Sequence, residues 1–128
     1  MISINNKKYN IDTIRILYGN YFARQDGKKR EGISPIICFQ CDKFYFRIET
    51  IYDKEWLNEM NFDTITDISK YISDISYEDE KGWLSLSYGN YKCMIKKIEN
   101  KVFNIELICE CEEVEEAFEI YLNENINI

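Results

Sequence analysis

The sequence predicts a single α+β domain, mainly an antiparallel β-sheet of about six to eight strands, with two or three helices packed on one side. Apolar and polar residues alternate along much of the chain, as in half-buried strands. Three shorter segments instead space their apolar residues as an amphipathic helix does. At 128 residues, without a Pro- or Ser-rich linker, the chain is too short for two substantial domains. We therefore take residues 1–128 as one domain.

The clearest pattern is an antiparallel meander over residues 82–111. A two-residue turn at Gly89-Asn90, with glycine supplying positive φ, would join its first two strands. The expected cross-strand pairs of that hairpin are Tyr88 with Tyr91, Leu86 with Cys93 and Leu84 with Ile95. A loop at residues 99–101 would lead into the next strand and place Ile95 opposite Ile105 and Cys93 opposite Leu107.

The opposite face of this meander is mixed in character. It is too polar for a second core and too apolar for plain exposure, so it is either partly covered or used for contact. Its expected members are Trp83, Ser85, Lys92, Met94, Lys96, Asn104, Glu106 and Ile108.

Several turns are predicted in the first half of the chain. Residues 2–11 indicate a small hairpin around an Asn-rich turn, and residues 34–41 and 43–52 indicate another. The sequence Tyr18-Gly19-Asn20-Tyr21 repeats residues 88–91, and we interpret it as the same turn chemistry used twice. Asp26-Gly27 predicts a further turn, flanked by four basic residues: Arg24, Lys28, Lys29 and Arg30. These are more typical of a solvated loop tip than of a nucleic-acid contact, which needs a broader basic surface with aromatic residues.

Helices are expected in three places. Asp53 can cap residues 54–61, and Thr64 can cap a segment in which Ile65, Ile68, Ile72 and Ile75 follow helical spacing. The last segment fits both the helical period and the strand period. Val114, Ala117, Phe118, Tyr121 and Leu122 fit a helix, whereas Phe118, Ile120, Leu122, Ile126 and Ile128 alternate as in a strand. We favour the helix and leave the strand open.

The formal charge of −7 belongs to the C-terminal segment. Residues 102–128 contain eight glutamates and no lysine or arginine, and the rest of the chain carries +1. Such a single-sign field repels nucleic-acid phosphates and attracts basic partners. The alternative is that these glutamates form a solvated face that keeps a small protein soluble.

Histidine is absent, which excludes Ser–His and Cys–His nucleophile pairs and every histidine-containing metal site. No segment predicts a signal peptide or a membrane helix, so five cysteines indicate reduced thiols and a cytoplasmic location. Four of them, Cys38, Cys41, Cys109 and Cys111, could in principle form a four-cysteine zinc site. However, Cys109 and Cys111 continue an apolar strand face, which explains them as small core residues. We expect no cofactor.

These features favour a non-catalytic, acidic binding protein, most simply an inhibitor or immunity-type protein that neutralises a basic protein such as a nuclease-like toxin. No catalytic constellation points to an enzyme. The expected partner-binding residues are Glu106, Glu110, Glu113, Glu116 and Glu119, with Trp83 and Met94 as apolar anchors. The alternatives are a structural or scaffold subunit that uses the mixed sheet face, and a small zinc-binding domain with four cysteine ligands.

Overall fold

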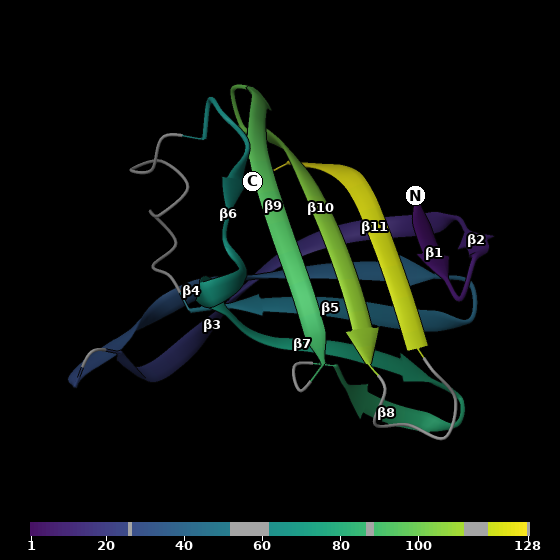
Figure 1. Ribbon diagram of the computed structural model, residues 1–128, viewed down its shortest axis with the longest axis horizontal. Coiled ribbons are helices and arrows are strands. Elements are labelled where there is room, and N and C mark those ends of the chain that lie inside the picture. Colours follow the sequence, from purple (N-terminus) through teal and green to yellow (C-terminus); the bar gives the residue numbers. More distant parts are fainter. Residues whose placement is uncertain (26, 52–61, 87–88, 112–117, 128) are drawn as a thin grey trace.

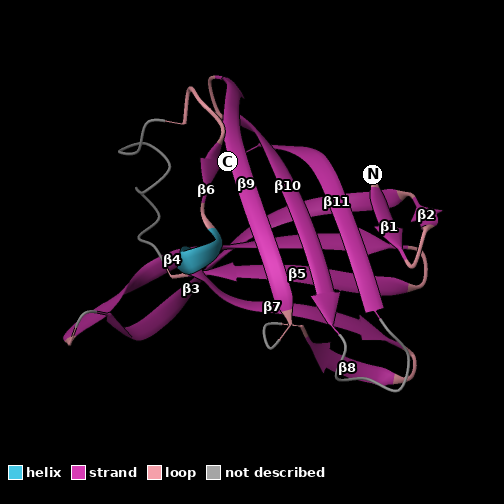
Figure 2. Cartoon of the chain, in the orientation of Figure 1, coloured by secondary structure: helices cyan, strands magenta, loops and turns pink. Residues whose placement is uncertain are grey.

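A computed structural model describes residues 1–25, 27–51, 62–86, 89–111 and 118–127. These residues are almost entirely β-strand (Figure 2). The strands are β1 (Ile2–Ile4), β2 (Lys7–Tyr9), β3 (Ile11–Gln25), β4 (Lys28–Cys41), β5 (Phe44–Thr50), β6 (Thr66–Asp67), β7 (Ile72–Asp79), β8 (Gly82–Ser85), β9 (Asn90–Glu99), β10 (Val102–Cys111) and β11 (Phe118–Asn127). One 3-10 turn, η1 (Ser69–Tyr71), precedes β7.

The strands form two antiparallel sheets that pack face to face, with strands of one crossing those of the other (Figure 1). One sheet has six strands in the order β2-β1-β11-β10-β9-β6, and the other has five in the order β3-β4-β5-β7-β8. The β3–β4 hairpin extends beyond the edge of the packed sheets (Figure 1). The architecture is therefore a β-sandwich with a projecting β-ribbon.

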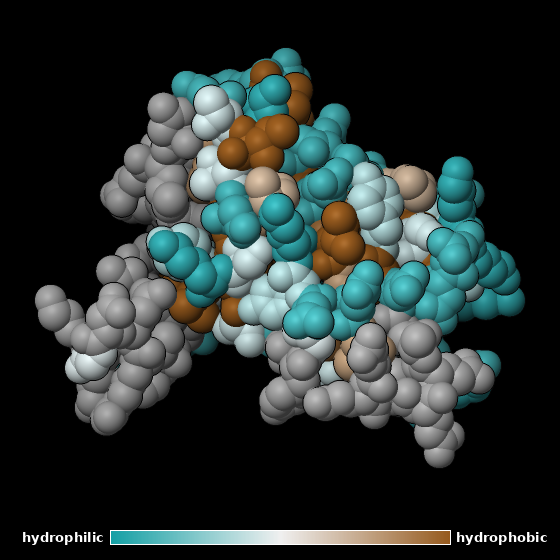
Figure 3. Space-filling view, viewed as in Figure 1, coloured by the Kyte–Doolittle hydropathy of each residue, from teal (hydrophilic) through white to brown (hydrophobic). Residues whose placement is uncertain are grey.

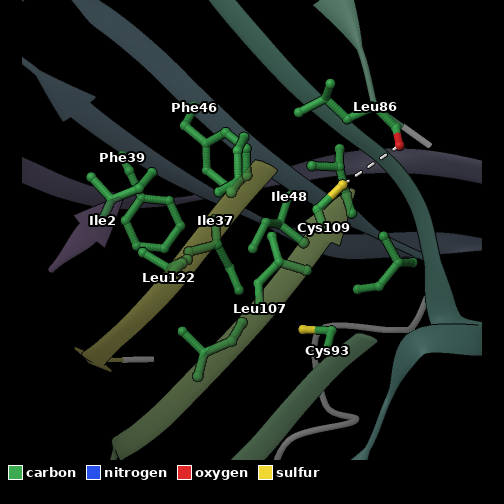
Figure 4. Packing of buried hydrophobic residues seen from close by; sticks show 14 of the residues in the cluster. Ile2, Ile37, Phe39, Phe46, Ile48, Leu86, Cys93, Leu107, Cys109 and Leu122 are labelled. Atoms are coloured by element: carbon green, nitrogen blue, oxygen red, sulfur yellow. Dashed lines mark hydrogen bonds between the residues drawn. The ribbon is translucent and has the colours of Figure 1, made fainter. Parts of the chain in front are cut away.

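The core lies between the two sheets and draws on both. Strand β5 alternates strictly, with Phe44, Phe46 and Ile48 buried and the residues between them partly exposed. From the facing sheet, Ile105 and Leu107 of β10 are fully buried. The Cys109 thiol reaches across to the Leu86 carbonyl oxygen at 3.8 Å (Figure 4). The contribution of both sheets to one apolar cluster explains why both can be half-buried without helices.

The α+β prediction is wrong, because the described residues contain two sheets in place of a sheet covered by helices. The segment that begins at Thr64 shows why. Ile72 and Ile75 are three residues apart yet both buried, although both lie in β7. The pairing of β5 with β7 shifts between Glu49 and Thr50, so an extra β7 residue bulges there. Such a bulge turns two residues three apart toward one face and imitates helical spacing.

The last segment is also a strand where it is described. β11 lies between β10 and β1, with Ile120, Leu122 and Ile126 buried. The helix interpretation is therefore wrong for residues 118–122, and the strand alternative is confirmed. Residues 112–117 of that predicted helix, and all of residues 54–61, lie outside the described residues.

Half of the predicted meander is correct. In β9 and β10, Ile95 lies opposite Ile105 and Cys93 opposite Leu107, as expected. β8, however, pairs with β7 in the other sheet, so the predicted pairs of Leu84 and Leu86 with β9 are wrong. Gly89 has a different role from the one predicted. A Cβ atom there would clash with the Glu110 carbonyl oxygen, so glycine permits close backbone packing.

The hairpins of the first half are mostly confirmed. β1 pairs with β2 through Asn5 and Asn6, which both have positive φ. β4 pairs with β5, and β3 with β4 across residues 26–27. Gly19 is not in a turn, because β3 continues through it and pairs it with Ser34. The repeated Tyr-Gly-Asn-Tyr sequence therefore does not mark a repeated structure.

Candidate functional site

The outer face of the six-stranded sheet carries most of the predicted partner-binding residues that the structure describes. Glu106 and Glu110 alternate with the buried residues of β10 and so point away from the core. Glu119 of β11 and Met94 of β9 lie on the same face, because they pair with Glu110 and Glu106 respectively. We call Glu106, Glu110 and Glu119 the acidic strip.

Trp83 does not belong to this group. It lies on β8 in the five-stranded sheet, opposite Glu78, and is 60% exposed. Its predicted position beside Met94 depended on a β8–β9 hairpin that does not form. Glu113 and Glu116 lie outside the described residues.

Glu110 and Glu119 lie directly opposite each other in the β10–β11 register. Among the described residues, neither carboxylate forms an ion pair. The two side chains border a small hollow of about 90 Å³, lined also by Ser3, Asn6, Ile108 and Tyr121. Like charges placed directly opposite each other destabilise a sheet. A cationic group bound between them would relieve that repulsion.

Glu106 is held in place by hydrogen bonds. Its Oε2 atom accepts one from the Tyr121 hydroxyl at 3.1 Å and one from the Asn123 Nδ2 atom at 3.3 Å. Asn104 links to the same row by donating to the Asn123 Oδ1 atom at 2.8 Å. The carboxylate is therefore oriented before any partner arrives, which lowers the entropy cost of binding.

The same face also carries positive charge, on β9. Lys92 pairs with Ile108 and Lys96 with Asn104, one strand away from the acidic strip. The face is thus acidic along β10 and β11 and basic along β9. This agrees with the mixed character predicted for the β9 and β10 residues, whereas the predicted inclusion of Trp83 and Ser85 is wrong.

An apolar groove of about 110 Å³ adjoins Glu106. Ile65, Met94 and Ile98 contribute its apolar walls, and Ile65 and Ile98 are 64% and 52% exposed. Apolar atoms are visible among polar ones on this face in Figure 3. Sequence reasoning missed Ile65, because it assigned that residue to a helix, and Ile98. The strand alternation that placed Met94 outward would also have placed Ile98 outward.

The cysteines are all free and all buried. Cys38 and Cys41 lie on one regular strand, β4, where residues three apart face opposite sides of the sheet. Cys41 joins the core, whereas Cys38 lies under the outer face. In the described part of the chain, no three Cys, Asp or Glu residues group as metal ligands. Burial raises the pKa of Cys41 and Cys109 to about 11, which favours the neutral thiol over a metal-binding thiolate.

A larger cavity lies elsewhere, beside the β4–β5 and β7–β8 turns. It measures about 730 Å³ and is lined by Lys7, Tyr9, Asp42, Lys43, Phe44, Tyr77, Asp79, Glu80 and Lys81. Its rings pack against one another, since Phe44 stacks on Tyr77 at 5.2 Å and meets Tyr9 edge-on at 5.1 Å. Three lysines and three acidic residues line it, so its lining carries no net formal charge.

No known family model matches the sequence, and neither the curated proteins nor the solved structures include a significant match. Within the described residues, no helix is long and apolar enough to cross a bilayer. Any functional assignment therefore depends on the chemistry of the surfaces above.

Proposed function

We propose that this chain is a non-catalytic binding protein that captures a basic protein partner, as an inhibitor or immunity-type protein would, through the acidic strip on its six-stranded sheet. The carrying observation is the cross-strand pair Glu110–Glu119, whose carboxylates have no ion pair among the described residues. An Arg or Lys side chain from a partner would gain two carboxylates at once.

The neighbouring residues support the same proposal. Glu106 is already oriented by Tyr121 and Asn123, so it would contact a second cation without reorganising. The groove formed by Ile65, Met94 and Ile98 would add apolar contact beside the charged residues. An apolar centre with a charged rim is the usual composition of a protein interface.

The experiment is a binding titration with a fluorescent Arg/Lys-rich peptide as probe. We expect Glu110→Gln/Glu119→Gln to weaken binding by about tenfold, as loss of a charged contact does. The matched control is Glu80→Gln/Glu99→Gln, which removes the same charge from the ends of other strands and should change affinity less than about twofold. Equal losses would show that only net charge matters and would overturn the proposal.

Salt dependence provides a second readout. Binding through the acidic strip weakens as salt rises, because the contact is exposed and screened. Affinity that is independent of ionic strength would contradict the proposal.

The exposed Ile65, Ile98 and Ile108 favour one alternative, a scaffold subunit that joins a second copy through this face. Sedimentation of the purified protein separates the two. A homo-oligomer that persists at high salt supports the scaffold, and a monomer contradicts it.

A further inference from the structure

A second small hollow lies on the opposite side of the molecule, on the outer face of the five-stranded sheet. It measures about 160 Å³ and is lined by Thr13, Arg15, Leu17, Cys38, Gln40 and Tyr45. A compact ion such as phosphate fits a space of that size.

Arg15 lines the hollow, and the strand order β3-β4-β5 places a second arginine, Arg47, on the other side of Cys38. Cys38 of β4 lies opposite Arg15 of β3 on one side and opposite Arg47 of β5 on the other. All three side chains therefore point to the same face. Arg15 and Arg47 lie on the two strands that flank β4, and both act electrostatically on the Tyr45 phenol.

The two arginines differ in what already binds them. The Arg47 Nη2 atom pairs with the Glu49 Oε1 atom at 2.7 Å, whereas its Nε atom is buried and has no hydrogen-bond partner among the described residues. A buried donor without an acceptor is unfavourable, but Arg47 does not line the hollow, so its Nε atom is not part of this site. Arg15 is exposed, and it forms no ion pair within the described ranges.

The remaining polar groups of the hollow are mostly neutral donors. Thr13 and Tyr45 provide hydroxyl groups. Burial and a side-chain hydrogen bond with Cys38 raise the pKa of Tyr45 to about 12, which keeps its phenol protonated at neutral pH. The Gln40 amide nitrogen already donates to the carbonyl oxygens of Cys41 and Phe44. Two acidic residues lie nearby, Glu49 paired with Arg47 and Glu78 opposite Tyr45.

We propose that this hollow binds an oxyanion of the phosphate class, held mainly by Arg15, with Thr13 and Tyr45 as hydroxyl donors. A tetrahedral oxyanion can accept from several donors at once, and a guanidinium fork binds two of its oxygens. Arg47 adds positive charge from the far side of Cys38. The site is independent of the acidic strip, which lies on the other sheet, so either proposal can fail without the other.

The test is a titration of the whole protein with inorganic phosphate at constant ionic strength, in which NMR measures the chemical shifts of the backbone amides. We expect saturable shifts in residues 13–17 and 38–45. Arg15→Gln should weaken binding at least about tenfold, and Tyr45→Phe by a smaller factor. Lys96→Gln is the matched control, because it removes one positive charge from the outer face of the other sheet and should leave binding unchanged.

A titration with phosphoserine distinguishes the sources of the anion. Phosphoserine that binds as well as inorganic phosphate would indicate a phosphate group on a larger molecule, and binding of inorganic phosphate alone would indicate the free ion. Both results support the proposal. Any of three results would overturn it. These are phosphate binding that does not saturate, equal weakening of that binding by Arg15→Gln and Lys96→Gln, and acetate binding as tight as that of phosphate.

Discussion

Glu110 and Glu119 face each other across the β10–β11 ladder, a cross-strand pair of like charges at the surface of an otherwise regular sheet. The described residues place no cation in ion-pair contact with either carboxylate. The pair therefore costs stability in the free protein.

This cost can be measured with a double-mutant cycle. Glu110→Gln and Glu119→Gln should each raise the free energy of unfolding by about 0.2–1 kcal/mol, and the double variant should add little to either single change. The coupling should shrink at high salt, because the pair is exposed. Strictly additive single effects, or a lower free energy of unfolding, would contradict the expected repulsion.

Truncation of the Leu86 side chain tests whether the two sheets share one core. Leu86 is fully buried, and its backbone N–H donates to the Ile75 carbonyl oxygen at 2.7 Å. Leu86→Ala should lower the free energy of unfolding by about 2–5 kcal/mol, as for other core truncations. Ile108→Ala is the control, because Ile108 is 44% exposed on the outer face. Denaturant unfolding that gave similar losses for both would contradict the sandwich core.

The turn between β1 and β2 should depend on the residue at position 6. Asn6 has φ of 68°, a region that asparagine and glycine tolerate and β-branched residues do not. Asn6→Val should cost about 1–2 kcal/mol in the free energy of unfolding, whereas Asn6→Gly should be neutral or slightly stabilising. Thermal unfolding of the two variants checks this, and equal melting temperatures would argue against the observed turn.

The buried thiols predict a loss of stability in alkaline solution. Burial raises the pKa of Cys93 from 9.0 to about 12, and those of Cys41 and Cys109 to about 11. Above pH 9 the unfolded chain loses these protons first, so it binds fewer protons than the folded chain. Stability is therefore complete below pH 9 and falls as pH rises toward the folded pKa values, by up to ~1.4 kcal/mol per pH unit for each thiol.

Denaturant unfolding between about pH 8 and about pH 10 measures this slope below the range in which tyrosines dominate. Cys93→Ala should flatten it relative to the parent protein, whatever the variant's stability at pH 8. A free energy of unfolding that stayed constant across this range would contradict the burial of these thiols.

The sequence correctly predicted which side chains share a strand face and where several turns lie. Alternation correctly placed Met94 and Glu106 on one face of the meander, which is the outer face of the six-stranded sheet. The Asn-rich turn near Asn6 was also correct. These features depend on side-chain periodicity and on backbone preference, which are properties of a few neighbouring residues.

The candidate sites could not be predicted without knowing how the strands pair. Glu119 meets Glu110 only because β11 lies beside β10, and Arg15 meets Cys38 only because β3 lies beside β4. The position of Trp83 was wrong for the same reason, since β8 pairs with β7 and not with β9. A strand's periodicity shows which side chains share its faces and carries no information about which strand will be its neighbour.

By itself, then, the sequence determined an acidic C-terminal segment, a set of inward-facing apolar residues and several turn positions. Only the tertiary structure decided that Ile72 and Ile75 lie on a bulged strand, that residues 118–127 form a strand, and that two sheets share one core. The physical reason is that a strand's hydrogen-bond partners are distant in the chain. The competition between helix and strand is therefore decided by the assembled sheet, not by the segment alone.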